Sequence, residues 1–313
     1  MQKKHIYSFN YDRHENDLCK LESRYIFNEE EENKLLFSDL TIEPSHSAFI
    51  KKRLDIILSS GDYADLITQI KNKKIHKEGF KVEYLILDND STVYAERLEK
   101  MRDIGHSIEG EAQYTNPTIL YGVCFFNNTW YFGELIKNNF DWHKHKQKPH
   151  SFSNSISSII AKSLVNIAKK DNPNATLIDT CCGVGTILLE ACFSNNKIDG
   201  CDINEKICRL ASENLDHYKY SAPIIHTDIM DVTKKYDAAI VDLPYNLFTK
   251  VSDDTHLHII KSAAQTSNKL IIVSTTDITN LINSIGFKVI DNCSIRKRGK
   301  ANFSRKIWVC ERC

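Results

Sequence analysis

The feature that most constrains the fold is a regular alternation of strand and helix patterns from Ala175 to the C-terminus. Short apolar runs such as TLID, KIDGCDI and DAAIVDL are separated by helical patterns such as EKICRLASENL and HLHIIKSAA. This alternation is typical of a parallel sheet covered by helices on both faces. The last two runs, FKVIDNCSI and KIWVCE, have no helix between them and predict an antiparallel edge hairpin. We therefore predict a doubly wound, Rossmann-like α/β domain over residues 151–313.

Residues 1–90 show a less regular pattern that predicts a smaller α+β domain of ferredoxin-like type. The runs HIYSF, LLFSDLTI and KVEYLILD are typical of strands. Apolar spacing predicts one helix over residues 16–27 and a second that is capped by Ser47 and continues to Leu58.

Residues 91–150 are predicted to connect the two domains. TVYAERLEKMRDI predicts a helix, and TILYGVCFF and TWYFGELI predict a β-ribbon with a turn at Asn127 and Asn128. The next segment, FDWHKHKQKPH, is polar and rich in Lys, and we interpret it as a linker.

Composition restricts the class of protein. The chain has 313 residues, of which 42% are hydrophobic and 26% charged, as expected for globular domains. No apolar run reaches the roughly 18 residues that span a bilayer, so we expect no membrane partner. The ten cysteines lie mostly in apolar patterns, which favours reduced thiols and a cytoplasmic location. Cys310 and Cys313 form a C-x-x-C without a second pair at matching spacing, so we predict no metal site.

Acidic residues end four of the predicted parallel strands, where sheets of this class bind ligands. The first end, Asp179, precedes Gly183 and Gly185, which let the backbone approach a ligand before a helix begins. The second and third ends are Asp202-Ile203 and Asp228-Ile229. Such residues suit the ribose hydroxyls and the base of an adenosine. A nicotinamide-dependent dehydrogenase would share the first two features, but its fingerprint requires a small residue where this chain has Leu188.

The fourth strand end, Asp242-Leu243-Pro244-Tyr245, predicts chemistry on a nucleobase amine. The lone pair of such an amine is delocalised into the ring, so the amine needs acceptors for its N–H bonds before it attacks. The Asp242 carboxylate and the Leu243 carbonyl would be these acceptors. Pro244 favours an extended backbone at Leu243, and Tyr245 offers a ring for a flipped base. A polar turn capped by Asp242 is the alternative, which the three acidic strand ends before it disfavour.

A basic strip near the C-terminus is the candidate contact with nucleic acid. Basic and acidic residues balance at 41 each over the whole chain, but basic residues predominate between Lys288 and Arg312. The segment IRKRGKANFSRK lies between the last two predicted strands, near the rim where a base would enter. The predicted RNA-binding residues are Arg296, Lys297, Arg298, Lys300 and Arg305. Lys144, Lys146 and Lys148 could add contacts with phosphates.

The stretch from Pro149 to Tyr245 resembles the S-adenosylmethionine-dependent methyltransferases of exocyclic base amines. Their fourth motif is Asn or Asp, then Pro, Pro, and Tyr or Phe. Within them it is most similar to the THUMP-linked tRNA guanosine N2-methyltransferases, which act at position 10 of tRNA. The segments KPHSFSNSISSIIAKSLVNIA, IDTCCGVGTILLEA and ASENLDHY carry this resemblance.

The resemblance implies a cofactor, S-adenosylmethionine, and a role for each matching residue. Asp179, Gly183, Gly185 and Thr186 would surround its methionine part, Asp202 its ribose and Asp228 its adenine, while Asp242 and Tyr245 would be catalytic. The full predicted cofactor set is Asp179, Cys181, Gly183, Gly185, Thr186, Asp202, Ile203, Asp228 and Ile229.

Two positions depart from the family pattern, because Thr180 and Leu243 stand where the family usually has Pro. Residues 1–90 are also shorter than a full ferredoxin-like piece plus a THUMP module, so we expect an RNA-binding or accessory role with at most a partial THUMP-like module. We predict an enzyme that methylates RNA, with guanine N2 of tRNA as the preferred target. Adenine N6 or ribosomal RNA guanine N2 stays an alternative target, and a non-catalytic RNA-binding protein is the alternative of another class.

Overall fold

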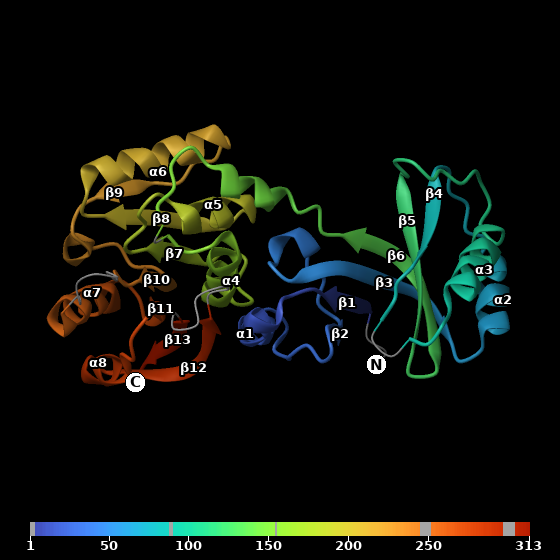
Figure 1. Cartoon of the computed structure of the whole chain (residues 1–313), viewed down its shortest axis with the longest axis horizontal. Helices are drawn as coiled ribbons and strands as arrows, with labels where there is room; N and C mark the ends of the chain where they lie inside the picture. Colours follow the sequence, from blue (N-terminus) through green and yellow to red (C-terminus); the bar gives the residue numbers. More distant parts are fainter. Residues whose placement is uncertain (1–3, 88–89, 154, 245–251, 297–303) are drawn as a thin grey trace. The chain divides into compact units, whose positions relative to one another are not determined.

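The computed structural model describes residues 4–87, 90–153, 155–244, 252–296 and 304–313. The chain forms two compact units (Figure 1). The N-terminal unit contains residues 1–10, 31–45 and 49–139, and the C-terminal unit contains residues 11–30, 46–48 and 140–313. This division differs from the predicted boundaries at residues 90 and 150. Residues 11–30 and 46–48 belong to the C-terminal unit, and most of the predicted connector belongs to the N-terminal unit.

The N-terminal unit is built on a six-stranded sheet with the strand order β2-β1-β3-β6-β5-β4. Neighbouring strands are antiparallel except β4 and β5, which are parallel. The strands are β1 (His5–Phe9), β2 (Leu35–Ser38), β3 (Ile50–Ser60), β4 (Phe80–Tyr84), β5 (Ile119–Phe126) and β6 (Thr129–Lys137). Helices α2 (Tyr63–Lys73) and α3 (Tyr94–Gly105) lie along the sheet and share a buried cluster with β4, β5 and β6 (Figure 1).

The predicted helix from Ser47 to Leu58 is wrong, because residues 50–60 form strand β3. Its apolar spacing fits a helix, but β3 pairs with β1 on one side and β6 on the other, and this pairing outweighs a short periodic signal. The sequence analysis also missed α2. Asp62 caps this helix by accepting a hydrogen bond from the Asp65 N–H, and Leu66 and Ile70 bury its inner face.

The predicted β-ribbon is confirmed as the hairpin of β5 and β6, with positive φ angles of 47° at Asn127 and 57° at Asn128. Its predicted role as a connector is wrong, because β6 pairs with β3 and β5 pairs with β4 inside the sheet. The ferredoxin-like assignment of residues 1–90 stays a prediction.

The C-terminal unit contains a seven-stranded sheet with the order β12-β13-β11-β10-β7-β8-β9. Strands β11, β10, β7, β8 and β9 are parallel, and β13 is antiparallel to both β11 and β12, which confirms the predicted Rossmann-like sheet and edge hairpin. The strands are β7 (Thr176–Asp179), β8 (Lys197–Asp202), β9 (Ile224–His226), β10 (Ala238–Asp242), β11 (Lys269–Ser274), β12 (Phe287–Arg296) and β13 (Ser304–Arg312). The chain leaves β7 toward β9 and returns to β10 beside β7, so the strand order reverses between β7 and β10.

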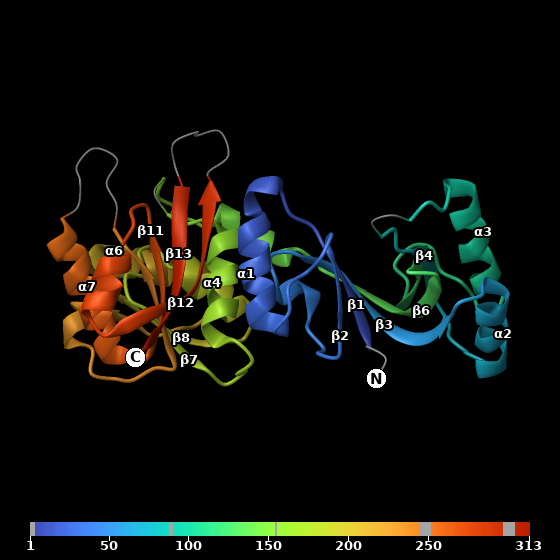
Figure 2. The same ribbon diagram turned by 90° about the horizontal axis from the view of Figure 1, so that it is seen from below.

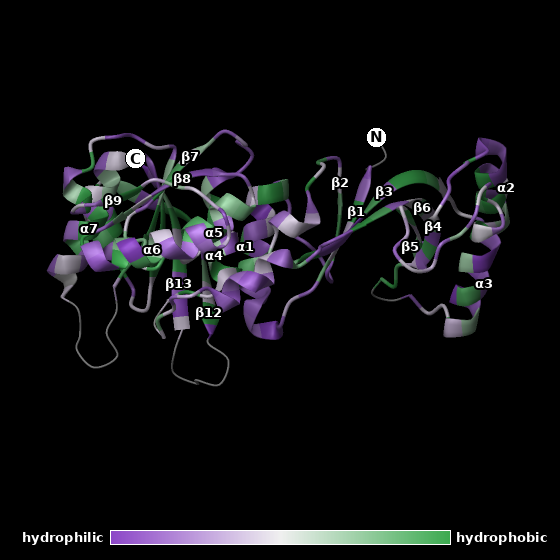
Figure 3. Ribbon diagram, turned by 90° about the horizontal axis from the view of Figure 1, so that it is seen from above, coloured by the Kyte–Doolittle hydropathy of each residue, from purple (hydrophilic) through white to green (hydrophobic). Residues whose placement is uncertain are grey.

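Helices cover both faces of this sheet. Leu270 of β11 belongs to a buried cluster with Ile260 of α7 and Ile282 of α8, whereas the neighbouring Lys269 donates to main-chain carbonyls at the end of α4. Because neighbouring strand residues point to opposite faces, α4 and α7 lie on opposite sides. Figure 3 shows hydrophobic central strands and a mostly hydrophilic α6. The helices are α1 (Asn16–Phe27), α4 (Ser158–Lys169), α5 (Thr186–Phe193), α6 (Glu205–His217), α7 (Asp253–Thr266) and α8 (Thr279–Ser284).

The segment interpreted as a polar linker is instead packed into the C-terminal unit. Residues Asp141–Gln147 form a 3-10 helix with Trp142 and His145 buried. His145 Nδ1 lies 2.9 Å from Glu190 Oε1, and Lys162 Nζ lies 3.4 Å from Glu190 Oε2. The contact between His145 and Glu190 joins the segment to α5, and Lys162 of α4 lies over the Trp142 ring at 5.3 Å. Within the described part of the chain, no helix has the length and apolar character required to cross a membrane.

Candidate active site

A cavity of about 500 Å³ opens at the carboxyl ends of β7, β8, β9 and β10. The cavity lies at the ends of β7 and β10, between which the strand order reverses, as expected for ligand binding in this fold. The lining residues are Phe152, Ser155, Thr180, Cys181, Gly183, Val184, Asp202, Ile203, Thr227, Asp228, Ile229, Asp242, Leu243, Pro244, Thr255, His258 and Ile259.

The loop after β7 is held in a conformation that suits glycine. Gly183 and Gly185 have φ angles of 51° and 78°, which side chains rarely adopt. Asp202 Oδ2 accepts a hydrogen bond of 3.0 Å from the Gly183 N–H, and Gly185 is the N-cap of α5. The loop therefore brings main-chain groups to the cavity wall without a side chain at Gly183, where a Cβ would meet open space.

The acids at the ends of β8 and β9 both line the cavity. Asp202 Oδ1 accepts from the Asn204 N–H at 2.9 Å, and Asp228 Oδ1 accepts from the Met230 N–H at 2.9 Å. Each carboxylate retains lone pairs for further donors, such as sugar hydroxyls or a base amine. Ile203 and Ile229 follow these acids and present apolar surface to the same cavity. This set can hold a planar base and a hydroxylated sugar.

Asp242 ends β10 and opens to the cavity beside the glycine loop. Its Oδ1 is shielded from water and has no hydrogen-bond partner among the described residues. Burial raises the pKa of Asp242 to about 7, and the positive charge of Arg305 opposes part of this rise. A carboxyl group with a pKa near neutrality can accept a proton and can be ionised again at physiological pH.

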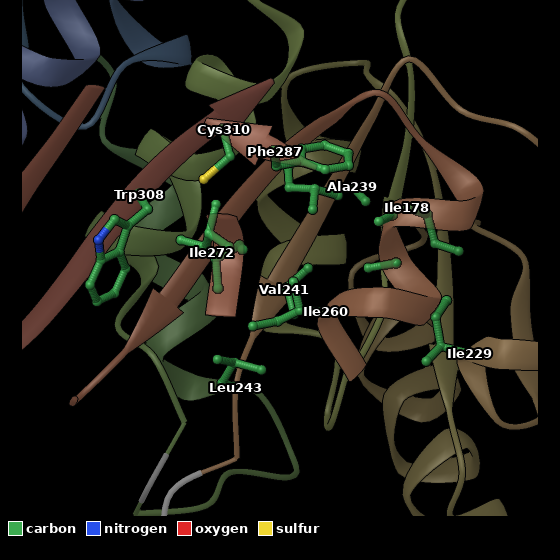
Figure 4. Packing of buried hydrophobic residues seen from close by; sticks show 14 of the residues in the cluster. Ile178, Ile229, Ala239, Val241, Leu243, Ile260, Ile272, Phe287, Trp308 and Cys310 are labelled. Atoms are coloured by element: carbon green, nitrogen blue, oxygen red, sulfur yellow. The ribbon is translucent and has the colours of Figure 1, made fainter. Parts of the chain in front are cut away.

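Thr180 and Leu243, which stand where the pattern of the resembling methyltransferases has Pro, both use their main-chain N–H groups. The Thr180 N–H donates to the Ile240 carbonyl at 3.0 Å, and the Leu243 N–H donates to the Val273 carbonyl at 3.0 Å. Proline has no N–H, so it could make neither bond. The Leu243 side chain is also buried in the cluster with Val241 and Ile260 (Figure 4). At these two strand ends the chain thus uses its N–H groups for sheet pairing.

Two histidines near the start of α7 complete the surroundings of the fourth strand end. His256 is buried, and its Nε2 lies 3.0 Å from the Pro244 carbonyl oxygen, so the tautomer with a proton on Nε2 donates a hydrogen bond to this carbonyl. His258 lines the cavity, and its Nε2 lies 3.6 Å from Asp228 Oδ1. The sequence analysis missed both, although the pattern H-L-H shortly after a strand-end acid could have indicated them.

The structure brings most of the predicted site together. Cys181, Gly183, Asp202, Ile203, Asp228, Ile229, Asp242, Leu243 and Pro244 line the cavity, whereas Asp179, Gly185 and Thr186 are adjacent in sequence but do not line it. Tyr245, Lys297, Arg298 and Lys300 lie outside the described residues. Arg296 and Arg305 line a second cavity. The individual roles of these residues stay predictions.

The comparisons agree with this geometry. Residues 146–257 match the family model described as RMKL-like, methyltransferase domain. A tRNA (guanine(10)-N2)-dimethyltransferase of Methanocaldococcus jannaschii is 25% identical over 211 residues, which are 60% of this chain and 57% of that protein. The protein of the same name from Pyrococcus abyssi is 25% identical over 278 residues, 82% of each chain.

This chain thus spans less than two thirds of the length of the first of these relatives. Among solved structures, TrmN from Thermus thermophilus aligns over 99% of both chains, with 14% identity and a TM-score of 0.49. The match over residues 146–257 confirms the predicted methyltransferase domain.

Proposed function

We propose that this chain, which carries an RMKL-like methyltransferase domain, transfers a methyl group from S-adenosylmethionine to an exocyclic base amine of RNA, with guanine N2 of tRNA as the target. One observation supports this most directly. The Asp242 carboxylate faces the cavity at the sheet switch point with a shielded, unpartnered Oδ1 among the described residues. The names of the curated relatives support tRNA and guanine N2.

The cavity residues fit the methyl donor. Two acids with spare acceptor capacity and two isoleucines suit an adenosine, and the glycine loop leaves room for the methionine part. When bound, S-adenosylmethionine supplies a methyl group on a positively charged sulfur. Asp202 and Asp228 would hold the adenosine, and the loop from Cys181 to Gly185 would orient the rest of the molecule toward Asp242.

Asp242 would act on the base amine. Its carboxylate accepts one N–H of the amine and so raises the electron density on nitrogen. With the amine held by Asp242, its nitrogen would form a bond to the methyl carbon that the sulfonium supplies, and the sulfur would leave with the electron pair of the C–S bond. The proton released by the amine then passes to Asp242, whose pKa of about 7 suits this transfer. Holding the amine in line with the methyl group would supply most of the rate, up to roughly 7–11 kcal/mol.

The other partners belong to the same proposal. Arg296 and Arg305 contribute positive charge near the site, as a phosphate backbone requires. We assign the N-terminal unit an accessory role in RNA binding, and we assign the enzyme to the cytoplasm, where reduced thiols and tRNA occur together. All ten cysteines are free, in keeping with such a compartment.

The test is transfer from labelled S-adenosylmethionine to three separate substrates: bulk tRNA, ribosomal RNA and DNA. Each product is digested to nucleosides and the label is identified. Label in N2-methylguanosine or N2,N2-dimethylguanosine from tRNA supports the proposal. Label only in N6-methyladenosine, or only from ribosomal RNA, refutes the proposed target. No label, together with no heat of S-adenosylmethionine binding in titration calorimetry, would indicate the non-catalytic alternative.

A further inference from the structure

A second cavity, of about 330 Å³, lies in the C-terminal unit next to the candidate active site. Its walls come from the start of α1, the start of α4, and the facing ends of β12 and β13, which lie side by side in Figure 2. Ser155 lines both cavities. The second cavity therefore adjoins the first at the segment that precedes α4.

The charge in this cavity favours an anion. Lys146, Arg296 and Arg305 contribute three cationic side chains, and Glu15 contributes the one carboxylate. Glu15 Oε2 already accepts a hydrogen bond from the Asp12 N–H at 3.2 Å. Arg305 is buried, with 6% of its surface exposed, which is uncommon for an arginine and places its charge inside a built wall instead of on the open surface.

The start of α4 adds to this preference. Residues 157–160 line the cavity, and the N–H groups in the first turn of a helix have no partner within the helix. Ser157 is the N-cap and accepts a hydrogen bond from the Ile160 N–H. A helix start, two arginines and a lysine around one cavity form a phosphate-binding arrangement. The apolar residues Leu18, Ile160 and Ile295 complete the wall and suit the non-polar face of a sugar.

Arg305 links this cavity to the reaction site. It lines the second cavity, and its positive charge also acts on the Asp242 carboxyl in the first. A ligand that occupies both cavities would pass Ser155. It would place an anionic group in the second cavity and a neutral group beside Asp242 in the first. A nucleotide within an RNA strand has this combination of a phosphodiester and a neutral base.

We propose that the second cavity binds a phosphodiester beside the target nucleotide and thereby positions the base at Asp242. This inference rests on the proposed RNA methyltransferase function and adds a phosphate-binding site built from Lys146, Arg296, Arg305 and the N-terminus of α4. Arg305 is a positioning residue in this scheme, because it acts on the base through the strand that carries it.

Ser157 offers a sharp test, because Asp and Asn cap a helix about as well as Ser. Ser157→Asp puts a negative charge at the cavity wall, and Ser157→Asn is its neutral control. We expect Ser157→Asp to bind bulk tRNA about tenfold more weakly than Ser157→Asn, since like charges at an interface repel. The affinity for S-adenosylmethionine should agree within about twofold between the two variants, because the first cavity keeps its charge. Equal tRNA affinities of the two variants would overturn the proposal.

A second pair of variants tests the cationic side. Arg296→Ala should weaken tRNA binding and reduce the slope of log affinity against log salt by about 1, as for the loss of one phosphate contact. Lys288→Ala removes the same charge from the opposite end of β12 and is the matched control. Equal effects of the two substitutions would indicate diffuse attraction and overturn the proposal.

The same experiments separate this inference from the proposed function. If the wild type transfers no methyl group to any nucleic acid, the function is refuted, while the affinity ratio at residue 157 still decides the cavity. If the wild type methylates tRNA but residue 157 has no effect on affinity or KM, the function stands and the cavity proposal fails. Binding of guanosine 5′-monophosphate with the same dependence on residue 157, without such dependence for tRNA, would assign the cavity to a free nucleotide and also overturn the proposal.

Discussion

Asp179 and Asp242 end neighbouring parallel strands, yet they meet different surroundings. Asp179 is 1% exposed and does not line the cavity, whereas Asp242 is partly exposed and faces it. Oδ1 of each carboxyl lacks a hydrogen-bond partner among the described residues. Burial raises the pKa of both, and for Asp179 the charge of Asp242 adds to the effect. The same sequence signal, an acid at a strand end, thus gives one enclosed carboxyl and one that can reach a ligand.

The contacts around the two strand ends also differ. After β7, the chain turns back over Asp179 through the glycine loop, and the Cys181 backbone hydrogen-bonds to its carboxyl group. After β10, the Leu243 N–H donates to the Val273 carbonyl, and His256 Nε2 of α7 lies 3.0 Å from the Pro244 carbonyl oxygen. Asp242 lines the cavity, and Asp179 does not. We expect Asp242 to act on substrate and Asp179 to support the loop.

The largest expected effect is that of Asp242→Ala on methyl transfer. Loss of the acceptor and proton-binding group should reduce the single-turnover rate by about 10²–10⁴-fold. S-adenosylmethionine affinity, measured by titration calorimetry, should stay within about twofold, since other residues hold the adenosine. The rate is measured with labelled S-adenosylmethionine and bulk tRNA. A parallel loss of cofactor affinity would show that Asp242 is structural, and the contrast with Asp179 would disappear.

The pH dependence of stability sharpens the comparison. An Asp in an unfolded chain has a pKa of about 4, and the folded value for Asp242 is about 7. Because the folded group holds its proton more tightly, its contribution to stability is complete below pH 4 and is lost as the pH rises to about 7. The Asn side chain of Asp242→Asn stays neutral at every pH, so this variant does not lose stability through ionisation at residue 242. Its free energy of unfolding relative to wild type should therefore increase between pH 4 and pH 7, by up to about 4 kcal/mol.

Urea unfolding at several pH values between 4 and 8 measures this difference. The Asp242 charge raises the pKa of Asp179 in the wild type and is absent in Asp242→Asn, so the titration of Asp179 changes the difference in the same direction. A difference that is flat over this range would mean that Asp242 is ionised at low pH in the fold, and the proton-accepting role would lose its physical basis.

The acidic strand ends show how far sequence reasoning reaches. The alternation of strands and helices predicted the parallel sheet, and the sheet rule then predicted that Asp202, Asp228 and Asp242 face one cavity, as they do. His256 and His258 were missed because their contacts with Pro244 and Asp228 depend on how α7 packs against the strand ends. Residues 50–58 were misassigned for a similar reason, since their apolar spacing fits a helix and only the pairing with β1 and β6 decides for a strand.

A smaller effect is expected at Leu243, which stands where the methyltransferases that this chain resembles usually have Pro. Leu243→Pro removes the N–H that donates to Val273, and Leu243→Ala keeps it while removing the same buried side chain. We expect Leu243→Pro to be less stable than Leu243→Ala by about 1–3 kcal/mol, because the Val273 carbonyl loses its partner. Thermal or urea unfolding of both variants measures the difference. Equal stability would show that residue 243 tolerates proline without loss of stability and that the Leu243 N–H contributes nothing to the fold.

The smallest effect is expected at Thr186, next to the enclosed strand end. Its Oγ1 is buried without a hydrogen-bond partner among the described residues, and Thr186 does not line the cavity. Thr186→Val keeps the shape and removes an unsatisfied hydroxyl, so stability should be unchanged or higher by up to about 1 kcal/mol. S-adenosylmethionine affinity should stay within about twofold in titration calorimetry, because the hydroxyl forms no part of the cavity wall. A larger loss of affinity would mean that the cofactor reaches past the glycine loop to the β7 side, and the division between an enclosed β7 end and an open β10 end would have to be abandoned.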